Sequence, residues 1–284
     1  MKRSLLLIGP GYLGVEIQRE FEVAGWQVIT ASRSDEQNPV DLGDVNSVYG
    51  LAEKLAFEGN SPNHVIHCAS ASAGRGATPE VRLASYQDVY LKGCQNLVEV
   101  FSSAHLLFTS STSVYGQQAG ETVTEESLTE PKTATAKVLV EAEQAVLSAN
   151  GTVVRLSGIY GSGKSYLLKR LFAGSATMDG DGERILNYIH HQDGASACLL
   201  LLERGEKGIF NVSETTNLTL KETYNAICGK FGIGVPASQS SEESLRRGLN
   251  KRVSNKKMLD LGWEPKYPSI LDAVDDVASS MGLI

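Results

Sequence analysis

Short apolar runs alternate along the first half of the chain with longer segments in which apolar residues recur every three or four positions. The run Ser4–Ile8 has the length of a strand, and Leu13, Ile17 and Phe21 after it share one face of a helix. The same patterns predict further strands at 27–30, 39–42, 64–68, 105–109 and 152–156, and helices at 45–57, 79–103 and 137–149. The helix over 79–103 could be broken in its middle. Strands that alternate with helices of this length predict an α/β fold with a doubly wound parallel sheet.

A glycine turn joins the first strand to the first helix, and it reads Gly9-Pro-Gly11-Tyr12-Leu13-Gly14. Gly9 permits the tight turn, Gly11 lets the backbone approach a pyrophosphate, and Gly14 lets the helix pack close to the strand. The helix N-terminus at Tyr12 and Leu13 offers free N–H groups and a partial positive charge to phosphates. The turn therefore predicts a dinucleotide site in a Rossmann fold.

The end of the second strand bears on which dinucleotide binds. NAD sites place a carboxylate there for the ribose 2′-hydroxyl, whereas NADP sites place an arginine nearby. The strand end here carries Ser32 and Arg33 and no acid, and Arg33 would form charge-assisted hydrogen bonds with a 2′-phosphate. Asp35 lies several residues past the strand. We therefore expect NADP as the cofactor, with NAD as the alternative.

Beyond residue 156 the regular alternation ends. Helices are expected at 167–174, 221–231, 241–248 and 270–281, and a strand at 208–213 returns to the main sheet. We predict a Rossmann domain over residues 1–156, completed by about 186–214. Residues 157–185 and 215–284 would form a small C-terminal substrate-binding lobe.

Composition and charge narrow the class of protein. The chain of 284 residues is 42% hydrophobic and 21% charged, as in soluble globular enzymes. A net charge of −7 argues against nucleic acid or an anionic membrane as partner. No apolar run reaches the roughly 18 residues that span a bilayer, and the start lacks the features of a signal peptide. The 4 cysteines lie far apart without metal-ligand spacing, so no metal is expected. We expect a cytoplasmic monomer or homodimer that binds a small-molecule substrate.

Further motifs follow in order along the chain. Small residues, among them Ala69 and Ser70, come after the strand at 64–68, where ligands of such a sheet bind. The other motifs are Asp41-Leu42, Ser110–Gly116, Arg155–Gly161, Ile189–Asp193, Gly208–Val212 and Gly262–Pro265. With the glycine turn, they resemble the extended and atypical short-chain dehydrogenase/reductases, the NAD-dependent epimerase/dehydratase family, over nearly the whole chain. The resemblance implies that Asp41 and Leu42 contact the adenine of the cofactor.

The resemblance also implies a catalytic Tyr-x-x-x-Lys pair and a Ser or Thr that orients the substrate. The tyrosine exchanges a proton with the substrate, and the lysine holds the nicotinamide ribose and lowers the tyrosine pKa. Ser111 occupies the Ser/Thr position. One register places Thr133 at the tyrosine and Lys137 at the lysine, and a second places Thr135 and Leu139 there.

Neither register contains a tyrosine. An aliphatic hydroxyl is a far poorer acid than a phenol, so Thr133 cannot simply replace it. Tyr90, Tyr115 or Tyr160 could supply a phenol from elsewhere in the chain. The expected function is an NAD(P)-binding oxidoreductase or epimerase-like enzyme acting on a small or sugar-like substrate. The alternative is a non-catalytic NADP-binding sensor or scaffold.

Three further features have competing interpretations. The segment Gly158–Ser165 fits the phosphate-binding pattern GxxxxGK[ST], which would make the chain a phosphotransferase. His190 and Asp193 have a spacing typical of a helix start, with the aspartate as cap, and His191 is expected at the surface. Four basic residues would form a solvated helix face or contact an anionic substrate: Arg246, Arg247, Lys251 and Arg252.

Overall fold

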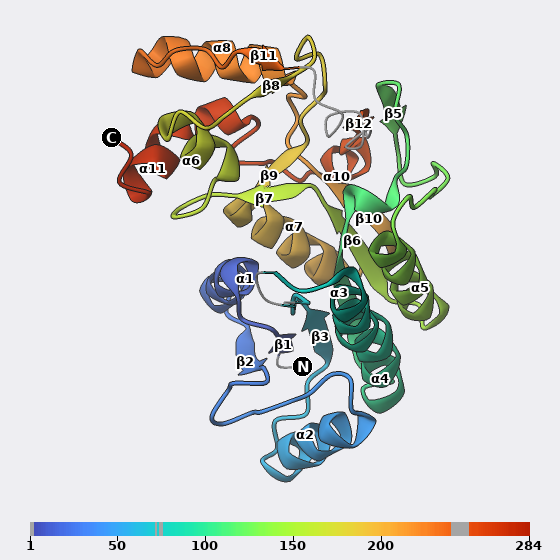
Figure 1. Ribbon diagram of the computed structural model, residues 1–284. Helices are drawn as coiled ribbons and strands as arrows, with labels where there is room; N and C mark the ends of the chain where they lie inside the picture. Colours follow the sequence, from blue (N-terminus) through green and yellow to red (C-terminus); the bar gives the residue numbers. More distant parts are fainter. Residues whose placement is uncertain (1–2, 72, 74–75, 240–249) are drawn as a thin grey trace.

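The computed structural model describes residues 3–71, 73, 76–239 and 250–284 (Figure 1). Its centre is a parallel sheet of six strands in the order β10-β6-β4-β3-β1-β2. The strands are β1 Ser4–Ile8, β2 Gln27–Ala31, β3 His64–His67, β4 His105–Ser111, β6 Thr152–Leu156 and β10 Gly208–Val212. This arrangement confirms the doubly wound α/β fold, and β10 pairs in parallel with β6 at the sheet edge as expected for residues 208–213.

Helices cover both faces of the sheet because successive side chains of each strand point to opposite sides. Leu5 and Leu7 of β1 pack with α1 (Tyr12–Val23) and α7 (His191–Arg204). Leu6 and Ile8 pack on the other face. That face is covered by α2 (Val45–Phe57), α4 (Gly93–Val100) and α5 (Ala134–Ser148). The near-continuous apolar run of β1 thus reflects a strand that is buried on both sides.

The long helix expected over 79–103 is interrupted in its middle. Its parts are α3 (Pro79–Tyr86), the π-helical segment η1 (Gln87–Lys92) and α4. A π-helical turn leaves backbone groups without their usual partners, and here the Nε2–H of His67 donates to the Val89 carbonyl at 2.9 Å. A side chain of β3 therefore forms a hydrogen bond with the backbone at this interruption of the helix.

The prediction of a strand at 39–42 is wrong. Only a single parallel bridge, between Ser32 and Pro39, remains of it. Asp41 instead forms a turn, in which its carboxylate accepts a hydrogen bond from the Gly43 N–H at 2.9 Å. Pro39 lacks an N–H to donate, which weakens a ladder at this edge of the sheet.

A smaller lobe lies beyond the carboxyl ends of the strands (Figure 1). Its core combines residues from α6, α8 and the C-terminal segment. The helix expected over 270–281 is divided at Ala273, and the one expected at 241–248 lies outside the described residues. The remaining elements of the whole chain, not all of which belong to this lobe, are β5 Glu121–Val123, β7 Gly158–Tyr160, α6 Tyr166–Phe172, β8 Met178–Asp179, β9 Tyr188–His190, α8 Leu220–Phe231, β11 Ser238–Gln239, β12 Lys251–Val253, α10 Lys256–Asp260 and α11 Val274–Ser280, with 3₁₀ turns η2 Thr112–Val114 and η3 Ile270–Asp272.

Asp193 joins this lobe to the sheet domain. Its two carboxylate oxygens accept hydrogen bonds from the N–H groups of Lys266 and Tyr267 at 2.7 and 3.0 Å. The expected helix cap is therefore wrong, because His190 is the N-cap of α7 and Asp193 binds a distant loop instead.

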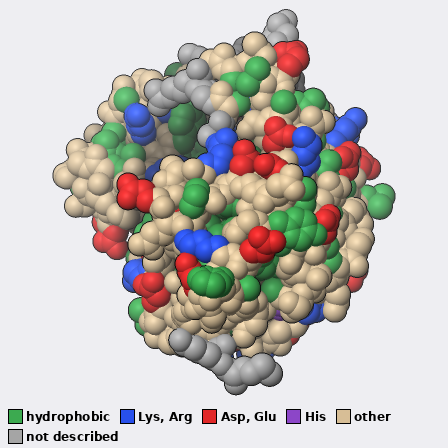
Figure 2. Space-filling model, turned by 90° about the horizontal axis from the view of Figure 1, so that it is seen from below, with side chains coloured by type: hydrophobic (Ala, Val, Ile, Leu, Met, Phe, Trp, Pro, Cys, Tyr) green, Lys and Arg blue, Asp and Glu red, His purple; other side chains and the backbone are tan. Residues whose placement is uncertain are grey.

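The surface view from below shows acidic and basic side chains interspersed with scattered apolar ones (Figure 2). This face therefore presents no field of a single sign. Among the described residues, no helix has the length and apolar character needed to cross a bilayer.

Candidate active site

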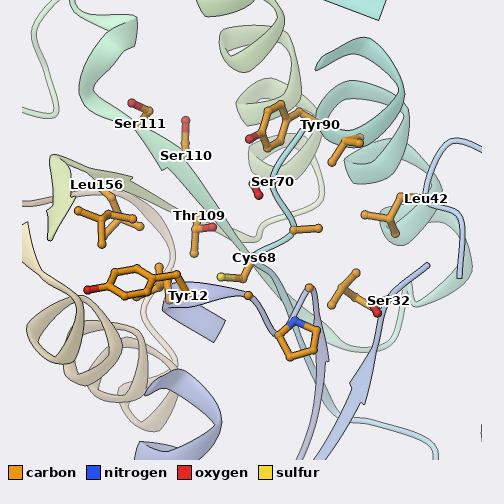
Figure 3. Close-up of a pocket in the computed structure, with 18 of the residues that line it drawn as sticks. Tyr12, Ser32, Leu42, Cys68, Ser70, Tyr90, Thr109, Ser110, Ser111 and Leu156 are labelled. Carbon is orange, nitrogen blue, oxygen red and sulfur yellow. The ribbon is translucent and has the colours of Figure 1, made fainter. Parts of the chain in front are cut away.

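A cavity of about 760 Å³ opens at the carboxyl ends of β1, β2, β3, β4 and β6 (Figure 3). The loops after these strands supply its lining, together with η1 and the start of β7. In a parallel sheet this is the edge at which ligands bind. Of the residues predicted for the cofactor, all but Gly14 and Lys137 line it: Gly9, Gly11, Tyr12, Leu13, Ser32, Arg33, Asp41, Leu42, Ala69 and Ser70.

The glycine turn forms one wall, and its three glycines are distinct in geometry. Gly9 has φ +87°, and a Cβ there would lie 2.3 Å from the Ala69 Cα. A Cβ at Gly14 would lie 2.5 Å from the Gly9 carbonyl oxygen, so α1 packs directly on the turn. A Cβ at Gly11 would meet no protein atom within 4 Å. Gly11 is also the N-cap of α1 and has no side chain to satisfy the first N–H groups. The turn thus leaves an open helix N-terminus that fits a pyrophosphate.

The end of β2 presents Ser32, Arg33 and Ser34 to the cavity. The nearby carboxylate of Asp35 is used inside its own loop. It accepts hydrogen bonds from the N–H groups of Gln37 and Asn38 at 2.9 and 2.8 Å. The charge presented to the cavity at this strand end is therefore the guanidinium of Arg33.

Three serines at the end of β4 lie at the other side of the cavity: Ser110, Ser111 and Ser113. Ser110 donates a hydrogen bond of 2.6 Å to Glu143, which forms a buried ion pair with Arg155 at 2.7 Å. The Ser111 hydroxyl accepts a hydrogen bond from the Ser113 N–H at 3.2 Å and lines the cavity as expected. This wall of the cavity therefore carries serine hydroxyl groups, of which that of Ser110 is fixed by the buried Glu143.

The structure corrects the register that placed Thr133 and Lys137 in the site. Thr133 is the N-cap of α5, where its hydroxyl accepts a hydrogen bond from the Ala136 N–H, and Lys137 is exposed. Neither lines the cavity, whereas Leu139 does. Two residues along a helix turn the side chain by about 200°, so Lys137 and Leu139 face different ways. The geometry therefore agrees with the register of Thr135 and Leu139.

Of the three phenols considered from the sequence, one reaches the cavity. Tyr115 is fully buried, and its hydroxyl accepts a hydrogen bond from Arg155 at 2.8 Å. Tyr160 is 2% exposed and lies in the core of the smaller lobe. Tyr90 lines the cavity (Figure 3). Burial raises the pKa of Tyr90 to about 12.

Lys164 is a second cation, besides Arg33, that lines the cavity. Lys164 Nζ lies 4.6 Å from the centroid of the Tyr12 ring. The ring of His191 stacks on Tyr12, with ring centroids 4.8 Å apart and planes 10° from parallel. The expectation of a surface His191 is wrong, because the ring is buried between Tyr12 and Gly161.

The phosphate-loop interpretation of Gly158–Ser165 is not supported by the backbone. Gly161 and Lys164 exchange both hydrogen bonds, each at 2.9 Å, so these N–H groups face carbonyls of the same turn. A phosphate-binding loop directs such N–H groups at the anion.

Lys251, expected on a solvated helix face, lies on β12 and is 7% exposed. Its ammonium donates to the Tyr115 carbonyl at 3.1 Å, and burial lowers its pKa to about 8. Arg246 and Arg247 lie outside the described residues. In the described ranges no group of three or more His, Cys, Asp or Glu residues is placed to hold a metal ion.

Comparison with known proteins agrees with this fold. The model of the NAD dependent epimerase/dehydratase family matches residues 5–213. The chain therefore belongs to the NAD-dependent epimerase/dehydratase family, whose members share this Rossmann architecture.

Individual relatives span the chain from end to end. It is 28% identical over 282 residues to protein YeeZ of Escherichia coli K12, covering 95% of this chain and 98% of that protein. The structure of Thermus thermophilus UDP-glucose 4-epimerase in complex with NAD superposes with a TM-score of 0.79 at 22% identity, covering 98% of this chain and 99% of that one. The human epimerase family protein SDR39U1 with NADPH gives 0.78 at 17% identity, covering 97% and 99%.

Proposed function

We propose that this protein is an NADP(H)-dependent oxidoreductase that acts on a carbonyl or hydroxyl group of a small or sugar-like substrate. The observation that carries the proposal is one cavity lined by Arg33 at the end of β2, by the glycine turn and by Ser111 at the end of β4. A nicotinamide cofactor supplies or accepts hydride when bound. The chain supplies binding, orientation and a proton.

The residues present fit such a cofactor. The uncapped N-terminus of α1 and the open space at Gly11 suit the pyrophosphate. Asp41 and Leu42 would hold the adenine, and Ala69 and Ser70 line the path toward the reacting end.

The choice of NADP over NAD rests on two side chains. Arg33 and its neighbouring serines line the cavity at the end of β2, where the ribose 2′-position of a bound dinucleotide belongs. The carboxylate of Asp35, which an NAD site would use, is held by Gln37 and Asn38. A 2′-phosphate would gain charge-assisted hydrogen bonds from Arg33 and meet no carboxylate from Asp35.

The substrate end is rich in hydroxyl groups. Ser111, Ser113 and Ser157 line it, and Lys164 adds a positive charge nearby. Hydroxyls can donate and accept hydrogen bonds, which suits a polar substrate with several oxygens. Ser111 would orient the reacting oxygen. We favour an enzyme over the alternative of a sensor because this hydroxyl and the Tyr90 phenol line the same cavity.

Fluorescence titration with NADPH and NADH tests the assignment of the cofactor. Arg33→Ala should weaken NADPH binding by about 10- to 100-fold, as expected for hydrogen bonds to a charged group, and leave NADH unchanged. Arg19→Ala, an exposed arginine on α1, is the matched control and should change neither. Tighter binding of NADH than of NADPH by the unaltered protein would overturn the preference.

A further inference from the structure

The π-helical segment η1 determines where Tyr90 lies. A π turn inserts an extra residue into a helix and locally changes the direction of the side chains that follow. His67 stabilises this turn by donating to the Val89 carbonyl next to Tyr90. His67 is fully buried and burial lowers its pKa to about 4, so the ring is neutral and the proton on Nε2 is fixed by its acceptor.

The Tyr90 hydroxyl is held at the cavity by one hydrogen bond. Its oxygen accepts from the Ala71 N–H at 3.2 Å, in the loop after β3. Among the described residues its own proton has no acceptor, so that proton is free for a ligand. Figure 3 shows the hydroxyl end of Tyr90 on the side of the ring that faces Ser110 and Ser70. The ring packs on Tyr86, with centroids 4.9 Å apart, and on Phe108.

The other two phenols of the cavity are less suited to proton donation. The Tyr12 hydroxyl already donates to the Ser162 carbonyl at 3.1 Å. Tyr86 also lines the cavity and lies one helical turn before Tyr90, but no N–H of the described backbone donates to its hydroxyl. Leu139, which lines the cavity from α5, has no acidic group and cannot serve as a proton donor. Tyr90 is thus the hydroxyl that is both positioned and free to donate.

We propose that Tyr90 is the general acid of this site and donates its hydroxyl proton to the substrate oxygen during carbonyl reduction. This inference rests on the proposed function. A bound reduced nicotinamide would supply the hydride to the carbonyl carbon and would itself be oxidised. The electron pair of the C=O π bond would then reside on the substrate oxygen, to which Tyr90 Oη donates its proton. The resulting phenolate, stabilised by the Ala71 N–H, regains a proton from water. The sum is reduction of a carbonyl to an alcohol with consumption of one proton.

The surroundings of Tyr90 favour this direction of reaction. Within the part of the chain that the structure describes, its titratable neighbours are Tyr86 on α3, Cys68 after β3, Cys94 on α4 and His67, none of them a cation. Burial raises the pKa of Tyr90 to about 12, so the phenol is protonated at neutral pH. Burial alone makes it a weaker acid than a free phenol, and the hydrogen bond from the Ala71 N–H acts in the opposite direction by lowering the Tyr90 pKa. Removing a proton from an alcohol would need the phenolate instead.

The test combines cofactor binding with turnover. Tyr90→Phe, Tyr86→Phe and the exposed control Tyr49→Phe are compared by NADPH fluorescence and by NADPH oxidation with diacetyl, glyceraldehyde and phenanthrenequinone. We expect Tyr90→Phe to bind NADPH within about threefold of the unaltered protein and to lose about 10²- to 10⁴-fold in kcat, the range for general acid catalysis. We expect ionisation of Tyr90 to lower the kcat of the unaltered protein at high pH, and we expect Tyr90→Phe to lack this decline.

Each outcome separates this inference from the proposed function. Failure of the unaltered protein to bind NADPH would overturn the proposed function. Binding without turnover of any of the three carbonyls would overturn the general acid alone. The same holds if Tyr90→Phe keeps its kcat, or if the loss occurs only in Tyr86→Phe.

Discussion

Ser110 donates a hydrogen bond of 2.6 Å to Glu143, linking the wall of the cavity to a carboxylate that is 1% exposed. Glu143 in turn receives the Nε and Nη2 hydrogens of Arg155, and Arg155 donates to the Tyr115 hydroxyl. Every charged atom of this pair has a close partner, which is the condition under which a buried ion pair is tolerated. Ser110, in the wall of the cavity, is thus fixed by a hydrogen-bonded network in the core.

Glu143→Ala should destabilise the protein by about 3–5 kcal/mol, because it leaves the Arg155 guanidinium buried without its counter-ion. Chemical denaturation measures the change in the free energy of unfolding. Glu141→Ala, an exposed glutamate on the same helix, should stay within about 0.5 kcal/mol. Equal effects of the two substitutions would contradict the network.

Substitutions at two glycines of the turn should distinguish a role in folding from a role in cofactor binding. Gly9→Ala should destabilise the fold, since a left-handed φ costs about 1–3 kcal/mol for other residues and the Cβ would overlap Ala69. Gly11→Val should keep its melting temperature and lose at least about tenfold in NADPH affinity, equivalent to about 1.4 kcal/mol. A Gly11→Val protein that folds and binds NADPH normally would remove the pyrophosphate from this turn.

Glu214 should make stability depend on pH. Burial raises its pKa from the ordinary 4.5 to about 8, while its carboxyl group accepts a hydrogen bond from the Ile270 N–H at 2.6 Å. Between pH 4.5 and 8 the folded state binds more protons than the unfolded state, so stability falls as pH rises.

Glu214→Gln keeps an acceptor for the Ile270 N–H and cannot ionise. We expect its melting temperature to exceed that of the unaltered protein at pH 8 and the dependence between pH 5 and 8 to flatten. Glu264→Gln, an exposed carboxylate, should leave the slope unchanged. A steeper slope in Glu214→Gln would show that the carboxylate is not the source.

Lys137→Ala tests the corrected register of α5. Because Lys137 is exposed and Leu139 lines the cavity, the substitution should change neither the NADPH dissociation constant nor the melting temperature measurably. A large loss of NADPH affinity would restore Lys137 to the site.

The sequence pattern predicts the sheet and the glycine turn well because both depend on local regularities. Alternation along β1 and the spacing of Leu13, Ile17 and Phe21 place residues on faces without knowledge of their partners. The structure confirms the need for glycine at both positions, because a Cβ at Gly9 would lie 2.3 Å from the Ala69 Cα and a Cβ at Gly14 would lie 2.5 Å from the Gly9 carbonyl oxygen.

The errors arise where the outcome depends on contacts between distant segments. The register of α5 differs by two residues between two plausible alignments, and only the packing of Leu139 against the cavity separates them. His191 and Lys251 are polar residues buried by partners far away in the chain, Tyr12 and Tyr115. The π turn that contains Tyr90 receives a hydrogen bond from His67, a contact that no local pattern reveals.

We propose above all that this cavity binds NADP(H). Isothermal titration calorimetry of the unaltered protein with NADPH and then with NADH tests it most directly. We predict one NADPH per chain, bound at least about tenfold more tightly than NADH, a difference of about 1.4 kcal/mol. Absence of binding by either dinucleotide would contradict the account.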